Sequence, residues 1–126
     1  MTVTLPVAAP PPATTNLCSI HFDRDPRRPV RVDNEGKACL DEIALNLQRT
    51  SDAKLVLVGN ASSAEKGGKK LAADRAVNTK AYLVSEKGID SSRIAVYTGS
   101  QDEKTVSTTL IPPGATFDAA GDTPVN

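Results

Sequence analysis

A short aliphatic run within residues Lys54–Val58 is the feature that most limits what this chain can fold into. The run is bounded by Asp52 and Gly59 and is too short for a buried helix, so it predicts a strand covered on both faces. The segments before and after it instead have apolar residues spaced three and four positions apart, as in amphipathic helices. A buried strand between two such helices indicates an α/β fold.

Two helices are predicted, at residues 34–49 and 69–87. The first follows Asp33, a residue type favoured at the N-cap, and the second ends at Gly88, a residue type favoured just past a helix C-terminus. Each helix has one stripe expected to face the core, and these stripes comprise Cys39, Leu40, Ile43, Ala44 and Leu47 in the first helix and Ala72, Ala76, Thr79 and Leu83 in the second.

Three more strands are predicted, at residues 17–22, 94–98 and 105–111. Helices that join consecutive strands favour parallel pairing through right-handed crossovers, whereas the short connection between the last two strands favours an antiparallel hairpin. The expected fold is therefore an α/β two-layer sandwich of order β-α-β-α-β-β, with a mixed four-stranded sheet and two helices on one face.

The chain has 126 residues, which suits one domain. Prolines at positions 6, 10, 11 and 12 indicate an extended linker over residues 1–16, followed by a domain over 17–117 and a flexible tail over 118–126. We expect the linker to join the domain to a preceding segment. The net charge of zero gives no pull toward nucleic acid or anionic lipid. No apolar run is long enough to span a membrane, so membrane association is expected only through regions outside this chain.

Residues suited to catalysis or metal binding are scarce. His21 is the single histidine, and no further His or Cys lies at metal-ligand spacing from it. The sequence also lacks a nucleophile and base pair, a phosphate-binding loop and a dinucleotide-binding motif. We therefore expect a protein that is not an enzyme and uses no metal or cofactor.

Two cysteines, Cys18 and Cys39, leave two alternatives open. They are either two free thiols or a disulfide, which would require Cα atoms within about 7 Å. A disulfide would stabilise the domain by roughly 3 kcal/mol and would indicate an oxidising compartment such as the periplasm.

The loop after the predicted strand 54–58 is the best candidate for a ligand site. Loops at the ends of buried strands hold ligands in many open α/β sheets, and the N-terminus of the next helix favours a carboxylate. Arg75, one turn into that helix, is expected to point toward loop 60–65 and leave an open notch beside it. The alternative is a solvated helix on which Arg75 pairs with Asp74 or Glu65.

Several motifs of this chain resemble the OmpA-like domain, a family that includes the C-terminal domain of OmpA, the peptidoglycan-associated lipoprotein and the flagellar motor stator protein. The resemblance covers residues 17–111. It is carried by Ile20–Asp23, Glu35–Asp41, Leu55–Ser62, Leu71–Ala76, Tyr82–Leu83, Gly88–Ile89 and Arg93–Ile94.

The resemblance implies a non-catalytic, peptidoglycan-binding domain in the periplasm, associated with the outer membrane. It implies that Arg75 grips the carboxylate of a diaminopimelate residue in the stem peptide, with Glu65 or Ser62 facing the ammonium group. Ser62 stands where the family has Asp, and Gly68 where it has Asn. A degenerate domain with a structural or protein-interaction role is the alternative. The full set of expected ligand-binding residues is Arg75, Ser62, Asn60, Ala61, Glu65 and Leu71.

Overall fold

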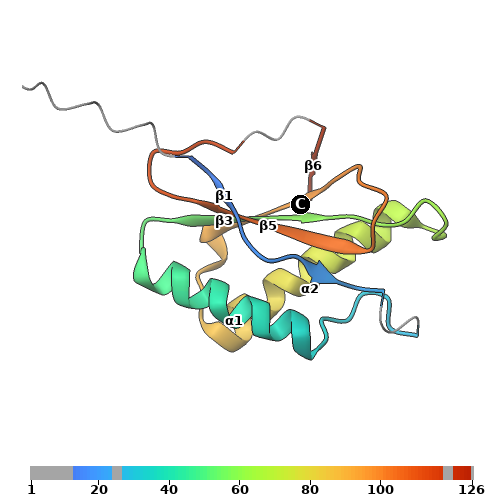
Figure 1. Ribbon diagram of the computed structural model, residues 1–126, viewed down its shortest axis with the longest axis horizontal. Coiled ribbons are helices and arrows are strands. Elements are labelled where there is room, and N and C mark those ends of the chain that lie inside the picture. Colours follow the sequence, from blue (N-terminus) through green and yellow to red (C-terminus); the bar gives the residue numbers. More distant parts are fainter. Residues whose placement is uncertain (1–12, 24–26, 118–120, 126) are drawn as a thin grey trace, which may run out of the picture.

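The computed structural model describes residues 13–23, 27–117 and 121–125. Two helices, α1 (Asn34–Arg49) and α2 (Gly68–Lys87), lie on one face of a single mixed sheet (Figure 1). This confirms the predicted fold class, and both helix positions agree with the prediction to within one residue. Asp33 caps α1 by accepting a hydrogen bond from the backbone N–H of Gly36.

Among the described residues, six strands rather than the predicted four form the sheet, in the order β1-β5-β3-β4-β6 with β2 also paired to β5. Of these strands, only β3 and β4 pair in parallel, through the predicted crossover of α2, and the other pairs are antiparallel. A short 3₁₀ helix, Ser91–Arg93, precedes β4. The strands span Thr15–Asn16 (β1), Ile20–His21 (β2), Lys54–Gly59 (β3), Ile94–Thr98 (β4), Thr105–Ile111 (β5) and Thr123–Pro124 (β6).

The hairpin predicted between β4 and β5 is wrong, because β5 pairs with β3 instead. The connection between them, residues 99–104, crosses the end of β3. There the N–H of Gly99 donates to the carbonyl of Gly59, and the N–H of Asn60 donates to the carbonyl of Thr105. Adjacent strands are only about 4.8 Å apart, so a six-residue connection is long enough to pass over one strand as well as to form a hairpin.

The strand predicted at residues 17–22 is interrupted by a bulge. Between the pairs Asn16–Thr109 and Ile20–Val106, the N-terminal segment has one more residue than β5, which makes a bulge. Thr108 pairs with the backbone groups of this bulge. Its carbonyl accepts the N–H of Leu17, and its hydroxyl donates to the carbonyl of Cys18.

Two of the predicted boundaries fall inside the sheet. β1 begins within the range predicted as linker, and β6 lies within the range predicted as tail. The linker prediction for residues 1–12, and the tail prediction for residues 118–120 and 126, lie outside the described residues.

The main core lies between the sheet and the two helices. It includes Leu40 and Ile43 of α1, Leu83 of α2, and Leu55 and Leu57 of β3. A smaller cluster on the opposite face covers the other side of β3, so this strand is buried on both faces, as predicted. In the described part of the chain, no helix is long and apolar enough to cross a membrane.

Cys18 and Cys39 form a disulfide, with their Cα atoms 6.1 Å apart. The bond joins the segment between β1 and β2 to α1. The disulfide prediction is therefore confirmed, and the alternative of two free thiols is wrong.

Candidate functional site

The candidate site lies where β3 ends and the chain turns toward α2. At this point the backbone of α2 passes very close to the strand, because a Cβ added to Gly59 would lie 1.9 Å from the carbonyl oxygen of Ala72. Glycine is thus required for this approach. The close contact brings Arg75, one turn further along α2, against the loop that follows β3.

The guanidinium of Arg75 is fully buried, with an exposed fraction of 0%. Its Nε donates to the carbonyl of Pro29 at 2.8 Å, and Nη1 donates to the carbonyl of Asn60 at 3.0 Å. It also lies 5.6 Å from the centre of the Phe22 ring, within the range of a cation–π contact. The side chain thus ties three separate segments to α2, and the predicted solvated helix face is wrong at this position.

Glu65 occupies the remaining side of the guanidinium. Its Oε1 accepts from Nη1 of Arg75 at 2.9 Å, and its Oε2 accepts from Nη2 at 2.6 Å. Oε1 also accepts the backbone N–H of Ser62 at 2.8 Å. Arg75 does point toward the loop, but the notch expected beside it is filled by this carboxylate.

The Glu65 carboxyl has a pKa below its usual value, chiefly because of the hydrogen bonds from Arg75. Burial opposes this lowering, and the backbone N–H of Ser62 adds to it. The carboxylate is therefore ionised at neutral pH. Its side chain is 13% exposed, so one edge reaches solvent while the arginine behind it does not.

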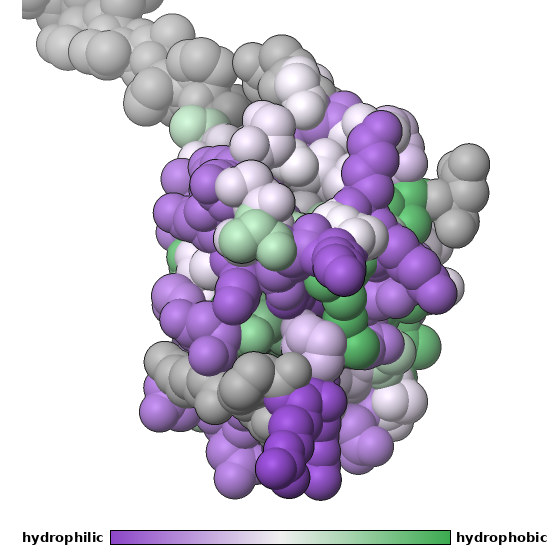
Figure 2. Space-filling model, turned by 90° about the vertical axis from the view of Figure 1, so that its right-hand side faces the viewer, coloured by the Kyte–Doolittle hydropathy of each residue, from purple (hydrophilic) through white to green (hydrophobic). Residues whose placement is uncertain are grey.

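A groove of about 480 Å³ opens beside this pair, and we call it the loop groove. One wall is the loop after β3 with the start of α2, and the other is the connection between β4 and β5. Figure 2 shows this end of the molecule as mainly hydrophilic. The loop groove is lined by Ala61, Ser62, Ser63, Glu65, Gly68, Lys69, Ala72, Thr98, Gly99, Ser100, Gln101, Asp102, Gly121 and Thr123.

Asp102 closes the loop groove from the side of the β4–β5 connection. It accepts the backbone N–H of Ser63 at 2.6 Å and the Ser63 hydroxyl at 3.1 Å. These hydrogen bonds lower the pKa of the Asp102 carboxyl. Two acidic groups, Glu65 and Asp102, therefore lie in the groove together with one basic group, Lys69.

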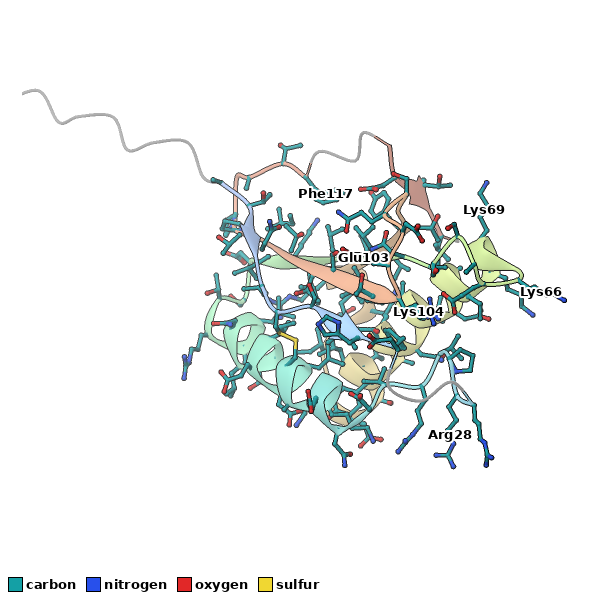
Figure 3. All side chains as sticks on the ribbon, turned by 45° about the vertical axis from the view of Figure 1, so that its right-hand side comes forward. Arg28, Lys66, Lys69, Glu103, Lys104 and Phe117 are labelled. Carbon is teal, nitrogen blue, oxygen red and sulfur yellow. A yellow bond between two sulfur atoms is a disulfide. The ribbon has the colours of Figure 1, made fainter. Side chains whose placement is uncertain are left out.

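Basic side chains also surround this end of the molecule. In Figure 3, Lys66 and Lys69 project outward from the loop and the start of α2, and Arg28 projects from the loop before α1. Among the described residues, no cluster of His, Cys, Asp and Glu could hold a metal ion.

The structure brings most of the predicted site residues together. Ala61, Ser62 and Glu65 line the loop groove. Arg75 and Asn60 lie behind it, and the guanidinium of Arg75 donates a hydrogen bond to the carbonyl of Asn60. Leu71 is partly buried in the first turns of α2 and does not line this groove.

Two charged residues of the loop groove, Lys69 and Asp102, were not predicted as site residues. Asp102 was missed because a β4–β5 hairpin would have placed its connection away from the end of β3. The observed crossover instead brings this connection against the loop. Lys69 could have been found from its place in the first turn of the helix that carries Arg75.

Comparison with known proteins supports the same fold. A model of the OmpA family matches residues 27–111. The OmpA-like domain of FopA1 from Francisella tularensis subsp. tularensis SCHU S4 superposes with a TM-score of 0.62 at 17% identity, covering 90% of this chain and 77% of that one. Comparison with curated protein sequences gives no match.

Two further solved structures have the same architecture. The peptidoglycan-associated lipoprotein from Burkholderia pseudomallei has a TM-score of 0.52 at 17% identity, covering 85% of this chain and 87% of that one. The periplasmic domain of Helicobacter pylori MotB has a TM-score of 0.53 at 13% identity, covering 67% and 66%. With the family match spanning most of the described sequence, the chain belongs to the OmpA family.

Proposed function

We propose that this chain is a non-catalytic periplasmic domain that binds the stem peptide of peptidoglycan in the loop groove. One observation carries the proposal: the carboxylate of Glu65 accepts the backbone N–H of Ser62, the position where the resemblance implies an Asp. The same carboxylate pairs with Arg75. These contacts support the acid–base pair that the resemblance implies, with its acid supplied by Glu65, three residues further along the loop.

The ligand contacts follow from the exposure of each charge. Arg75 is buried and is already hydrogen-bonded to Glu65, so it acts as a positioning residue that holds this carboxylate. The exposed edge of Glu65 accepts the ammonium group of diaminopimelate, and Lys69, in the same groove, receives its carboxylate. This differs from a direct grip by Arg75, because a ligand carboxylate could reach that guanidinium only by displacing Glu65.

The periplasmic location is supported by the disulfide between Cys18 and Cys39, because such bonds persist in oxidising compartments.

Calorimetry with the tripeptide L-alanyl-γ-D-glutamyl-meso-diaminopimelate tests the proposal. Glu65→Gln should weaken binding by about tenfold or more, because it removes the charge that meets the ammonium group. Adding Ser62→Asp to Glu65→Gln should restore binding, since it returns a carboxylate to the same place. Glu103→Gln, an acidic position outside the loop groove, is the matched control and should bind as wild type does.

A tripeptide with L-lysine in place of diaminopimelate keeps the ammonium group and lacks the carboxylate. It should bind more weakly to wild type, and Lys69→Ala should reduce this difference. Equal affinity of Glu65→Gln and wild type for the diaminopimelate peptide would contradict the assignment of the ammonium site.

A second candidate function is a structural or protein-interaction role without peptidoglycan binding. It is favoured by the engagement of Arg75 with Pro29, Asn60 and Glu65, which makes this arginine a tie between segments. Co-sedimentation with purified sacculi separates the two candidates. Wild type remaining in the supernatant would support the structural role and overturn the peptidoglycan proposal.

A further inference from the structure

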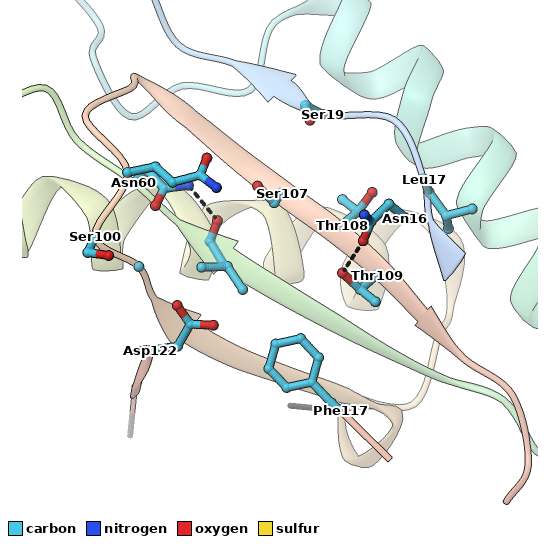
Figure 4. Close-up of a pocket in the computed structure, with 13 residues that line it drawn as sticks. Asn16, Leu17, Ser19, Asn60, Ser100, Ser107, Thr108, Thr109, Phe117 and Asp122 are labelled. Atoms are coloured by element: carbon cyan, nitrogen blue, oxygen red, sulfur yellow. Dashed lines mark hydrogen bonds between the residues drawn. The ribbon is translucent and has the colours of Figure 1, made fainter. Parts of the chain in front are cut away.

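The sheet carries a second groove, of about 460 Å³, on the face opposite the helices. We call it the open-face groove. Its floor is formed by β5 and the end of β3, and its sides by residues 16–19 and by Phe117 and Asp122. In Figure 4, Asp122 and Phe117 lie on one side of β3, and Ser107 and Thr109 lie on the other, along β5.

Strand register gathers polar side chains on this floor. Ser107 is paired with Val58, and Thr109 is paired with Asn16 across the neighbouring strand. The hydroxyl of Thr109 donates to Oδ1 of Asn16 at 3.3 Å. Because alternate residues of a strand point to the same face, Ser107 and Thr109 present two hydroxyl groups in a row.

A buried hydrogen-bond acceptor lies at one end of the open-face groove. Asn60 is 1% exposed, and its Oδ1 has no hydrogen-bond partner among the residues that the structure describes. A Cβ added to Gly99 would lie 2.5 Å from this oxygen and 3.4 Å from Oδ1 of Asp122. That Cβ would also lie 2.8 Å from Cγ1 of Val58, so glycine is required at position 99 for the Asn60 side chain to lie where it does. An unsatisfied buried acceptor is costly, so a ligand donor that reached Oδ1 of Asn60 from the groove would be stabilising.

The lining defines the chemistry of a matching ligand. The groove has one carboxylate, from Asp122, several hydroxyl and amide groups, and no Lys, Arg or His among its described residues. An anionic ligand is thus disfavoured, and a neutral ligand rich in hydroxyl donors is favoured. Val58 and Phe117 add an apolar surface, which suits the C–H face of a sugar ring.

We propose that the open-face groove binds a neutral sugar ring, whose hydroxyl groups donate to Asn60 Oδ1 and to the Asp122 carboxylate. The site does not depend on the function proposed for the loop groove. The two grooves share the residues 99–101 of the β4–β5 connection, but Glu65 and Lys69 line only the loop groove, whereas Ser107 and Thr109 line only the open-face groove.

Titration of the isotope-labelled domain with N,N′-diacetylchitobiose and, separately, with maltose tests this proposal by NMR. The first probe carries N-acetyl groups and the second does not, so the pair distinguishes an N-acetylated glycan from an unsubstituted one. At least one should bind with a dissociation constant of about 1 mM or tighter and shift the amide signals of Asn16, Ser107 and Thr109. Shifts confined to Ser62 and Glu65 would place the sugar in the loop groove and overturn the proposal, as would no shift with either probe.

Two variants link the binding to the acceptor oxygens. Asp122→Asn keeps the side-chain shape and removes the charge, and it should weaken sugar binding by about fivefold or more. Asp52→Asn, an exposed position in the turn before β3, is the matched control and should leave the affinity unchanged. Gly99→Ala places a Cβ against Oδ1 of Asn60, so it should displace that side chain and abolish binding. If Asp122→Asn and Ser107→Val both bind as wild type does, the open-face groove is not a sugar site.

Discussion

The carboxylate of Glu65 and the guanidinium of Arg75 form a two-point contact, at 2.9 and 2.6 Å, between residues ten positions apart. The arginine is completely buried, and the glutamate is almost so. A charge in such a place is tolerated only while its partners remain. The pair therefore governs the stability of the domain as well as the shape of the loop groove.

Removing the buried cation should be strongly destabilising. Arg75→Ala leaves Glu65 without its partner and frees the carbonyl groups of Pro29 and Asn60, so the free energy of unfolding should fall by about 3–5 kcal/mol. Urea denaturation measures this loss. Lys70→Ala, at an exposed position of the same helix, should change stability by less than about 0.5 kcal/mol. A loss for Arg75→Ala no larger than that of this control would show that the ties made by Arg75 are unimportant.

The lowered pKa of Glu65 predicts a specific pH dependence. Because the folded pKa lies below the unfolded value of about 4.3, the ionised pair stabilises the fold above that value. This contribution is lost as the pH falls through the lower folded pKa. The stability difference between wild type and Glu65→Gln should be constant from pH 7 to about pH 5 and should shrink below about pH 4. Thermal unfolding across this range measures it, and a difference that grows in acid would refute the assignment.

The close approach of β3 and α2 predicts an unusually sensitive glycine. Gly59→Ala should cost several kcal/mol or prevent folding, because the new Cβ would overlap the carbonyl of Ala72. Gly68→Ala is the matched substitution, since its Cβ would meet only Ala61 at 3.7 Å. At this helical position alanine should be neutral or stabilising by up to about 1 kcal/mol. Circular dichroism melting compares the two, and similar melting temperatures would contradict the packing described.

The disulfide predicts both a thiol count and a stability change. Denatured, unreduced protein should contain no free thiol from Cys18 or Cys39. The double variant Cys18→Ser/Cys39→Ser should lose roughly 3 kcal/mol, because the unfolded chain regains the freedom of the closed loop. Titration with a thiol reagent and denaturant unfolding check the two statements. Two free thiols in the unreduced protein would exclude the bond.

Local sequence pattern predicted the helices and the central strand well. The aliphatic run of β3 and the three- and four-residue spacing in α1 depend on nearby residues, which a sequence reveals directly. The bulge between β1 and β2 and the position of β5 depend on pairing across the whole chain. Neither leaves a local signal, so the hairpin and the continuous first strand were predicted incorrectly.

The site was predicted only in part, because some of its contacts leave a local signal in the sequence and others depend on distant segments. Arg75 and the loop after β3 could be located from motif and helix position, and pairing with Glu65 was one of the alternatives. The complete burial of Arg75 could not be foreseen, because it depends on Pro29 and Phe22, which reach it from a distant segment. The role of Asp102 required knowing that the connection between β4 and β5 crosses the end of β3.

The pairing of β5 with both N-terminal strands and with β3 has a consequence for the order in which the protein can fold. The N-terminal strands pair only with β5, and contacts such as that between Cys18 and Thr108 join residues 90 positions apart. Such distant pairing slows folding, because the chain must close a long loop before it gains contacts. A nascent chain that ends before Thr105 therefore has no partner for β2, whereas the Cys18–Cys39 bond needs only the first third of the chain. Oxidation can thus precede completion of the sheet, and β5, which is synthesised after β3 and β4, joins the N-terminal strands to the rest.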